Sequence, residues 1–329
     1  MNHVGLRGGL GLALASAASF ATSGPFAKAL AESGWSPGAA VTVRVVGAAL
    51  LLLGPAVVLL RGRWGVLRAN AWHVASFGLV AVAACQLFYF NAVQTLSVGV
   101  ALLLEYLGIV LVVLWLWARH AQRPRRWTLV GVALSLAGLA LVLDVAGGVR
   151  VDVGGVLWGL GAALGLATYF VLSARETEGL PPLVLAAGGL VVAAVALVVC
   201  GALRLVPLEW STTDVVLAGR PVPWWAPLLG LCALSTSFAY ATGVTATRAL
   251  GSKLASFVGL TEVMFSVLIA WLLLDELPLP VQLLGGVLIV AGVVAVRYDE
   301  LANVASPGSP VCRTDVVDPA PVVPTTLAG

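Results

Sequence analysis

The chain has 329 residues, of which 60% are apolar and 10% are charged, and its mean hydropathy is +1.03. An ordinary soluble domain has about 25% charged residues, so polar side chains cannot cover this much apolar surface in water. The composition excludes a soluble enzyme, a nucleic-acid-binding protein and a disordered chain, and the net charge of +3 identifies no partner.

Long uncharged runs recur along the chain, and a helix of about twenty apolar residues crosses the bilayer core. The run from Val74 to Leu104 is too long for one crossing, and we place its division near Thr95 to Ser97. The runs lack the strict alternation of membrane β-barrel strands. We therefore predict an all-α integral membrane protein with ten transmembrane helices, over residues 8–31, 38–60, 72–95, 98–118, 126–144, 153–174, 182–205, 224–247, 253–274 and 279–297.

The distribution of Lys and Arg agrees with this helix count. With both termini on the cytoplasmic side, the inner connections hold 13 of these residues and the outer connections hold 3. An excess of positive charge is typical of cytoplasmic loops. We expect a multi-pass protein of the cell (plasma) membrane with both termini cytoplasmic, and we interpret residues 301–329 as a disordered cytoplasmic tail.

Two parts of the sequence resemble each other. Residues 92–138 correspond to 246–292 at a constant offset of 154, which matches Trp117 with Trp271 and Gly138 with Gly292. Two halves of five spans each must enter the membrane from opposite sides, which is an inverted-topology repeat with its substrate site near the midplane. We predict a first repeat over residues 1–148 and a second over 149–300; the alternative is chance similarity between helices rich in Gly, Leu and Val.

Two segments carry a resemblance to a known family. The segment 254–296, LASFVGLTEVMFSVLIAWLLLDELPLPVQLLGGVLIVAGVVAV, resembles the last two helices of the EamA family in the drug/metabolite transporter (DMT) superfamily. Residues 89–142 resemble the matching part of its first repeat, and ALLLEYLGIV within them is similar to the threonine/homoserine exporter branch. The resemblance covers about residues 8–297 and implies ten spans in two inverted halves and transport, commonly export, of small metabolites. Many members have a proline in the fourth or ninth helix, and this chain has none there.

Four ionisable residues lie within the predicted spans: Lys28, Arg44, Glu105 and Glu262. Each costs about 2.5–3.5 kcal/mol or more at a helix centre facing lipid, so we expect them to face a cavity or each other. Glu105 is about seven residues into its helix from outside and Glu262 about nine from inside, which places them roughly 10 and 13 Å deep. The repeat offset matches Glu105 with Gly259 and Gly108 with Glu262, so the two acids lie one turn apart on equivalent helices.

We therefore expect Glu105 and Glu262 to line a central cavity, where either could exchange a proton or pair with a substrate amine. The alternative is structural: a hydrogen bond between helices, or a permanent ion pair with Lys28 or with Arg44, which lies at the depth of Glu105. Lys28 is interpreted as a residue that snorkels to the outer interface. The remaining candidates for the substrate or proton pathway are Arg44, Gln86, Tyr89, Tyr169, Tyr240 and Ser256.

Small residues on several helices indicate close packing. Ser16, Ser19 and Ser23 form a stripe on the first helix, which Pro25 is expected to kink. Four glycines are expected to let the fifth and tenth helices approach each other: Gly131, Gly138, Gly285 and Gly292.

The sequence thus predicts a secondary transporter, an exporter of amino acids or related compounds that works by alternating access, with proton coupling as a further hypothesis. The alternative is a polytopic membrane enzyme acting on a lipid, although the three histidines are scattered and the acids do not cluster. No glycine-rich Lys-Ser/Thr loop for a nucleotide occurs, and we expect no cofactor and no bound metal. The expected partners are a small-molecule metabolite and the lipid bilayer, without nucleic acid, and a homodimer is a further hypothesis.

Overall fold

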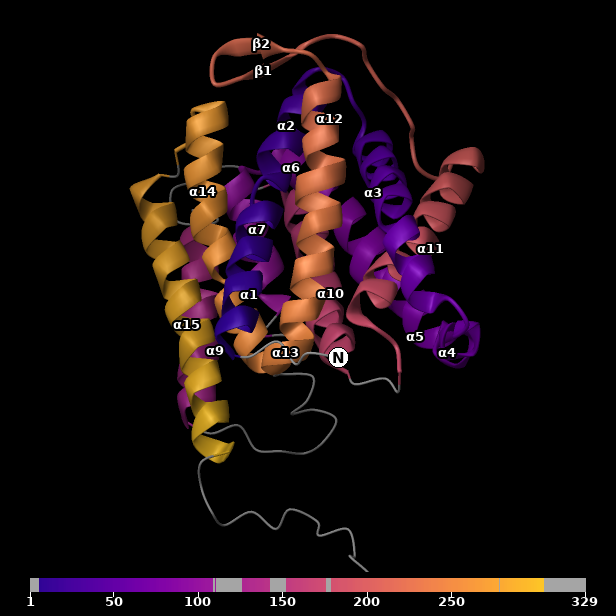
Figure 1. Cartoon of the computed structure of the whole chain (residues 1–329). Coiled ribbons are helices and arrows are strands. Elements are labelled where there is room, and N and C mark those ends of the chain that lie inside the picture. Colours follow the sequence, from indigo (N-terminus) through magenta and orange to yellow (C-terminus); the bar gives the residue numbers. More distant parts are fainter. Residues whose placement is uncertain are drawn as a thin grey trace, which may run out of the picture.

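The computed structural model describes residues 6–108, 110, 126–142, 152–175, 179–277 and 279–304. The inner part of the expected helix 98–118, the connection that follows it and the tail beyond Val304 lie outside the described residues. The described chain forms a bundle of roughly parallel helices (Figure 1). Its helical elements, in chain order, are α1 (Leu6–Phe20), α2 (Ser23–Glu32), α3 (Pro37–Leu60), α4 (Trp64–Ala69), α5 (Ala71–Ser76), η1 (Phe77–Ala84), α6 (Cys85–Thr95), α7 (Val98–Tyr106), α9 (Arg126–Val142), α10 (Val153–Ala174), α11 (Pro182–Ala202), α12 (Trp225–Cys232), η2 (Ala233–Phe238), α13 (Ala239–Gly259), α14 (Thr261–Leu274) and α15 (Pro280–Val304).

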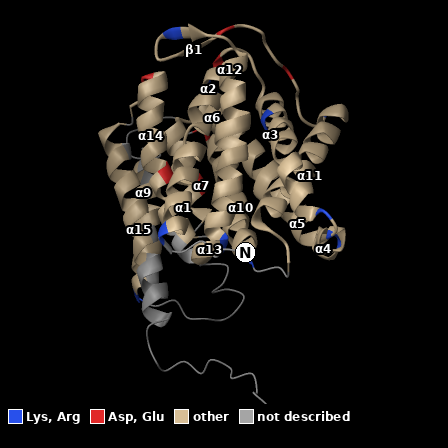
Figure 2. Ribbon diagram, viewed as in Figure 1, with Lys and Arg blue, Asp and Glu red and all other residues tan. Residues whose placement is uncertain are grey.

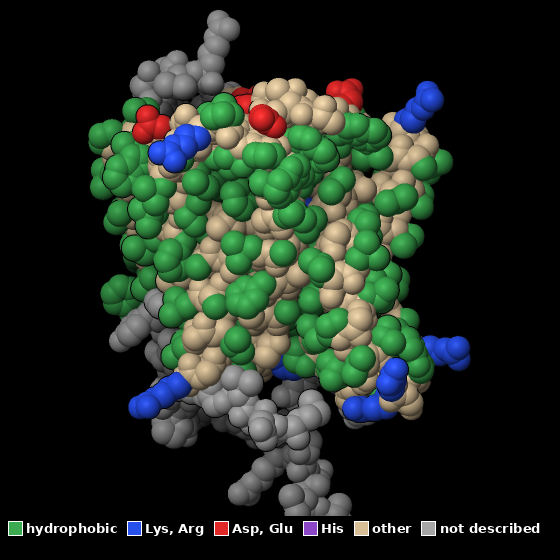
Figure 3. All heavy atoms as spheres, turned by 45° about the horizontal axis from the view of Figure 1, so that its top comes forward, with side chains coloured by type: hydrophobic (Ala, Val, Ile, Leu, Met, Phe, Trp, Pro, Cys, Tyr) green, Lys and Arg blue, Asp and Glu red, His purple; other side chains and the backbone are tan. Residues whose placement is uncertain are grey.

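The helices confirm an integral membrane protein. Within the described residues, six helical segments are long and apolar enough to cross a bilayer, and three shorter apolar helices accompany them. Large apolar side chains cover the sides of the bundle, and charged side chains lie toward its two ends (Figure 3). Most of the coloured Lys and Arg residues in Figure 2 lie at the end that carries α4, and most acids lie at the opposite end. The exposed sides therefore face lipid, and the two ends differ in charge.

Most predicted spans are found where the apolar runs place them. The helix predicted over 153–174 is α10, the one predicted over 38–60 is α3, and the division near Thr95 to Ser97 is confirmed because α6 ends at Thr95 and α7 begins at Val98. The last helix, α15, continues to Val304, past the end predicted for it at residue 297.

Two predicted helices are broken. The first is interrupted at Ala21 and Thr22, between α1 and α2, because Pro25 has no N–H to donate to the carbonyl of Ala21. The ninth was predicted as one helix over 253–274, and it is interrupted at Leu260, between α13 and α14. Before this second break, α13 is kinked at Gly251, whose φ of +77° is not helical.

Both halves of the chain contain a π-helical segment before a buried α-helix. η1 ends at Ala84 and η2 ends at Phe238, positions that differ by the same 154 residues as the sequence repeat. In η2 the hydroxyls of Thr236 and Ser237 donate to the carbonyls five residues earlier, at 2.7 and 2.6 Å. Side-chain donors thus bind carbonyls that the wider turn shifts out of ordinary α-helical register.

A small β-hairpin accompanies the helices of this mostly helical protein. Strands β1 (Val215–Leu217) and β2 (Arg220–Val222) pair antiparallel within the long connection between α11 and α12. The two turn residues, Ala218 and Gly219, have φ values of +51° and +70°, as a two-residue type I′ hairpin requires. The Ala218 N–H donates to the carbonyl of Leu273 at 2.7 Å, so the hairpin rests on the end of α14.

The predicted glycine packing between the fifth and tenth helices is confirmed. α9 lies along α15, and a Cβ added to Gly138 would lie 2.5 Å from the carbonyl oxygen of Gly285. A Cβ added to Gly292 would meet the carbonyl oxygen of Gly131. Any larger side chain at Gly138 or Gly292 would force the two helices apart.

Candidate functional site

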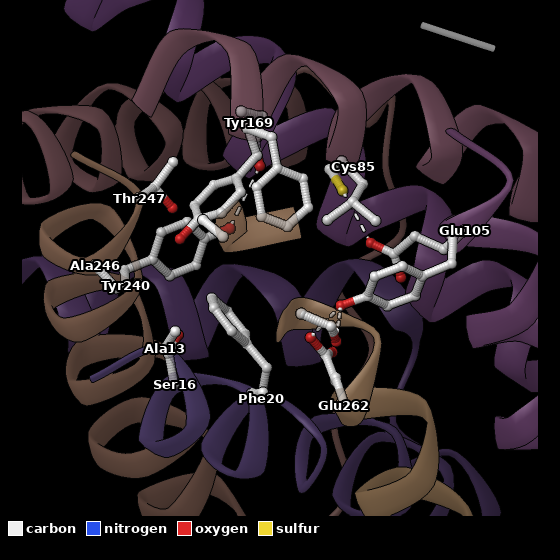
Figure 4. A pocket seen from close by; sticks show the side chains of 18 of the residues that line it. Ala13, Ser16, Phe20, Cys85, Glu105, Tyr169, Tyr240, Ala246, Thr247 and Glu262 are labelled. Atoms are coloured by element: carbon white, nitrogen blue, oxygen red, sulfur yellow. Dashed lines mark hydrogen bonds between the residues drawn. The ribbon is translucent and has the colours of Figure 1, made fainter. Parts of the chain in front are cut away.

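A cavity lies in the middle of the bundle, between α1, α6, α7, α10, α13 and α14 (Figure 4). It contains about 720 Å³ of space not occupied by atoms, part of which is open to the outside. Six of the eight predicted pathway residues line this cavity: Gln86, Tyr89, Glu105, Tyr169, Tyr240 and Glu262.

The two carboxyl groups meet at one end of the cavity, as predicted (Figure 4). Glu105 lies in the last turn of α7, and its Oε1 accepts a 3.3 Å hydrogen bond from the thiol of Cys85. Glu262 lies in the first turn of α14, and its Oε2 is 3.0 Å from the hydroxyl oxygen of Tyr106, within hydrogen-bond distance. Each acid therefore has one neutral polar partner from a neighbouring helix and otherwise faces the cavity.

The helix break beside Glu262 occurs without a proline. α13 ends at Gly259, and the carbonyl of Gly259 accepts a 2.6 Å hydrogen bond from Tyr106. The side chain of Tyr106 therefore binds a carbonyl at the end of the helix, which is the kind of substitute partner that a broken membrane helix needs. Ser256 and Gly259 consequently lie on α13, whereas Glu262 and Ser266 lie on α14.

Arg44 lies outside the cavity lining and does not form the predicted alternative ion pair. Its guanidinium is fully buried and donates to the hydroxyls of Ser23 and Thr236 at 2.5 and 2.8 Å and to the carbonyl of Ser235 at 3.1 Å. It also lies 5.0 Å from the ring centroid of Phe90. In the part of the chain that the structure describes, no carboxylate lies within 4.0 Å of this guanidinium.

Lys28 forms an ion pair with an acid outside the cavity. Its ammonium lies 2.6 Å from Oε1 of Glu276, in the connection between α14 and α15. The other oxygen of Glu276 accepts from the N–H of Val98, the first residue of α7, at 3.4 Å. Lys28 therefore joins α2 to the ends of two other helices instead of pairing with either acid in the cavity.

The opposite end of the cavity is aromatic. The rings of Tyr169, Tyr240 and Phe20 lie edge to face, with centroid separations of 5.1 to 6.3 Å. The amide of Gln86 donates to the Tyr240 hydroxyl at 3.1 Å, and that hydroxyl donates to the carbonyl of Ala81 at 3.3 Å. These side chains form a rigid wall in which the polar atoms are paired.

Sequence reasoning missed several lining residues and predicted two, Arg44 and Ser256, that do not line the cavity. Ser256 is fully buried one turn before the helix break, and it is not a lining residue. Ser16 and Ser23 were assigned to packing; Ser16 does donate to the carbonyl of Ala239, at 2.8 Å, but both serines also line the cavity. Further lining residues that were not predicted are Cys85, Tyr106, Phe20, Phe170 and Thr247. The position of Tyr106 directly beside Glu105 was the available signal.

Comparisons with known proteins agree with this arrangement. The profile of the EamA-like transporter family matches residues 7–144 and again residues 153–298. The chain is 28% identical over 255 residues to the uncharacterized transporter YwfM of Bacillus subtilis (strain 168), which covers 76% of this chain and 82% of that protein. A solved crystal structure covers 91% of this chain and 99% of its own, with 24% identity and a TM-score of 0.61, and so has a similar fold.

Proposed function

The chain belongs to the EamA-like transporter family and is a multi-pass membrane transporter rather than an enzyme, and from this premise we propose that it is a secondary transporter that exports amino acids or related metabolites by alternating access. The family and the transporter relative do not favour the alternative of a lipid-modifying enzyme. The likeness of ALLLEYLGIV to the threonine/homoserine exporter branch supports an amino acid substrate.

The proposed architecture has ten helices in two inverted repeats, over residues 1–148 and 149–300. Support comes from the two separate family matches and from the two π-helical segments, which end 154 residues apart. Further support comes from the helix ends beside the acids: α7 ends at Tyr106, and Leu260, the repeat equivalent of Tyr106, separates α13 from α14. An inverted repeat can open alternately to either side of the membrane, because its halves exchange conformations.

The observation that carries the proposal is the meeting of Glu105 and Glu262 in one cavity. Carboxyl groups inside a membrane protein are costly unless they serve a pathway. A carboxylate there can bind a substrate ammonium, and a carboxyl can carry a proton. The single hydrogen of Tyr106 cannot be donated both to Gly259 and to Glu262, so a proton on Glu262 would complete the second contact. This geometry supports proton coupling.

We place the transporter in the plasma membrane with both termini in the cytoplasm. The positive charge around α4 supports this orientation, since cytoplasmic loops are rich in Arg and Lys.

Metabolite profiling of the medium of overexpressing cells first identifies candidate amino acid substrates. The test is then the transport of these amino acids, in labelled form, into sealed vesicles that contain the purified protein. Glu262→Gln keeps the shape of the side chain and removes its charge and exchangeable proton, and we expect it to abolish transport while the protein remains inserted and folded. Glu209→Gln, at an exposed acid in the long outer connection, is the matched control. Normal transport by the Glu262 variant would contradict the proposal. If substrate accumulation in the vesicles is unchanged after the proton gradient is collapsed, proton coupling is contradicted, but the assignment as a transporter is not.

A further inference from the structure

Arg44 is a buried cation whose described partners are all neutral. Three of its five N–H donors bind two hydroxyls and a carbonyl, and its plane faces the ring of Phe90. Such contacts orient a guanidinium but do not neutralise its charge, and a buried charge without a close counter-charge is costly. Glu105 and Glu262 interact with Arg44 electrostatically, but among the described residues no carboxylate lies within 4.0 Å of it. The position is therefore suited to an anion that is not part of the described chain.

Ser23 connects this cation to the cavity. Its hydroxyl oxygen accepts from Arg44, so its own hydrogen is free to donate, and Ser23 lines the cavity while Arg44 lies behind it. The positive charge behind the hydroxyl makes it a stronger donor to an anion.

Ser23 is also the first residue of α2, which begins directly after the two-residue interruption that follows Phe20. Ser23 therefore lies inside the bundle at the point where the first helix is broken. The side chain of Tyr89, another lining residue, contacts Gly24, so the cavity extends to the start of α2.

One cavity thus contains two acids, on α7 and α14, and the hydroxyl of Ser23 at the start of α2, which accepts a hydrogen bond from Arg44. We infer that Ser23, supported by Arg44, binds the carboxylate of a zwitterionic substrate whose ammonium group faces Glu105 and Glu262. The inference rests on the proposed function and narrows it, because it requires substrates with both charged groups. Ser23 contacts the substrate, and Arg44 is a positioning residue that acts through Ser23.

The experiment compares amino acids with the amines that remain when the carboxylate is removed. The probes are L-threonine with 1-amino-2-propanol, and L-phenylalanine with 2-phenylethylamine, in binding and vesicle-transport assays with the full-length protein. For at least one pair we expect the amino acid to bind at least tenfold more tightly than its amine. Ser23→Ala should reduce affinity for that amino acid about tenfold and leave affinity for the amine unchanged, since it removes one hydrogen bond to a charged group.

Control variants separate recognition from folding. Ser23→Thr keeps the hydroxyl and should retain most of the preference. Ser19→Ala removes a buried hydroxyl that donates to its own helix, at Ala15, and should change nothing. Arg44→Lys should lower the preference for the amino acid, whether or not it also lowers the yield of folded protein.

The outcomes distinguish this inference from the proposed function. The carboxylate site would be overturned if each amine were transported as fast as its amino acid, or if Ser23→Ala reduced the affinity for both equally. Either result would leave the assignment as a transporter unchanged. A second outcome is that the protein transports neither member of either pair but still exports other metabolites in a manner that depends on Glu262. This result would overturn the zwitterion site and would leave the protein as a transporter of another substrate. Loss of all Glu262-dependent export would instead contradict the proposed function itself.

Discussion

Gln86 and Tyr240 stand 154 residues apart in the chain, and the Gln86 amide donates a 3.1 Å hydrogen bond to the Tyr240 hydroxyl. The same offset relates the two similar stretches of sequence and the ends of the two π-helical segments. Residues at equivalent positions of two repeats can touch only near the axis that relates the repeats. The pair therefore marks where the proposed symmetry axis passes, at the wall of the cavity.

The first prediction concerns the stability of this pair, which is buried on both sides. Tyr240→Phe removes the acceptor of Gln86 and the donor to the carbonyl of Ala81, and it should destabilise the protein by about 1–3 kcal/mol. Gln86→Leu combined with Tyr240→Phe should cost less than the sum of the single changes, because fewer unpaired polar atoms remain. The apparent melting temperature in detergent measures both effects. Strictly additive losses would show that the two side chains do not interact.

The position of the spans could be predicted from the sequence because length, apolarity and flanking charge are properties of the chain alone. Asp152, for example, directly precedes the apolar run that forms α10, and the side chain accepts the N-cap hydrogen bond from Gly155 at 2.9 Å. The breaks were harder to predict. The interruption at Leu260 and the π-helical segments do not change the composition of an apolar run, and they depend on partners that are distant in sequence, such as Tyr106 for Gly259.

The candidate site was predicted in part for a similar reason. Glu105 and Glu262 were identifiable because ionisable residues inside a membrane are rare and costly. The partners of Arg44 were not, since Ser23 and Thr236 come from helices that only the fold brings together. Ser23 has the ordinary appearance of a packing residue in the sequence. Its role in the cavity follows from the break that places it at the start of α2.

A second prediction concerns Gly251, whose φ of +77° and ψ of +161° are almost restricted to glycine. A Cβ at this position would meet no atom within 4 Å, so any cost of Gly251→Ala comes from the backbone alone, about 1–3 kcal/mol. Gly11→Ala is the matched control: its Cβ also meets nothing, but Gly11 is helical, and the change should stabilise α1 by up to about 1 kcal/mol. Thermal unfolding should therefore shift in opposite directions. Equal shifts would contradict a backbone requirement at Gly251.

A third prediction concerns acid stability. Hydrogen bonds from Thr95 and from the Gly155 N–H hold the pKa of the exposed Asp152 carboxyl below its usual range. Because the folded state lowers this pKa, the stabilisation is present above the unfolded value of about 3.9 and is lost as the pH falls through the folded value. Asp152→Asn cannot titrate but retains an oxygen for Gly155. The difference in melting temperature between wild type and this variant should shrink from about pH 6 to about pH 3. A difference that does not change with pH would argue against the carboxylate as the stabilising form.

The last prediction follows from the proposed orientation and alternating access, in which Lys28 and Glu276 would help to close the outer end. Their charged groups are 2.6 Å apart, and 23% and 21% of the two side chains are exposed. This ion pair joins α2 to the connection after α14, and Glu276 also accepts from the start of α7. Lys28→Met should weaken the closed outer end by about 1 kcal/mol, which raises the outward-open population about fivefold.

Cys85 is a built-in probe for this opening, because it lines the cavity beside Glu105. In a background with Cys200, Cys232 and Cys312 replaced by serine, a membrane-impermeant maleimide added from outside should label Cys85 faster in Lys28→Met than in the parent. The charge reversal Lys28→Glu with Glu276→Lys should restore slow labelling, since it re-forms the pair in the opposite sense. Labelling that is equally slow in all three proteins would mean that other contacts hold the outer end closed, such as the β-hairpin on Leu273.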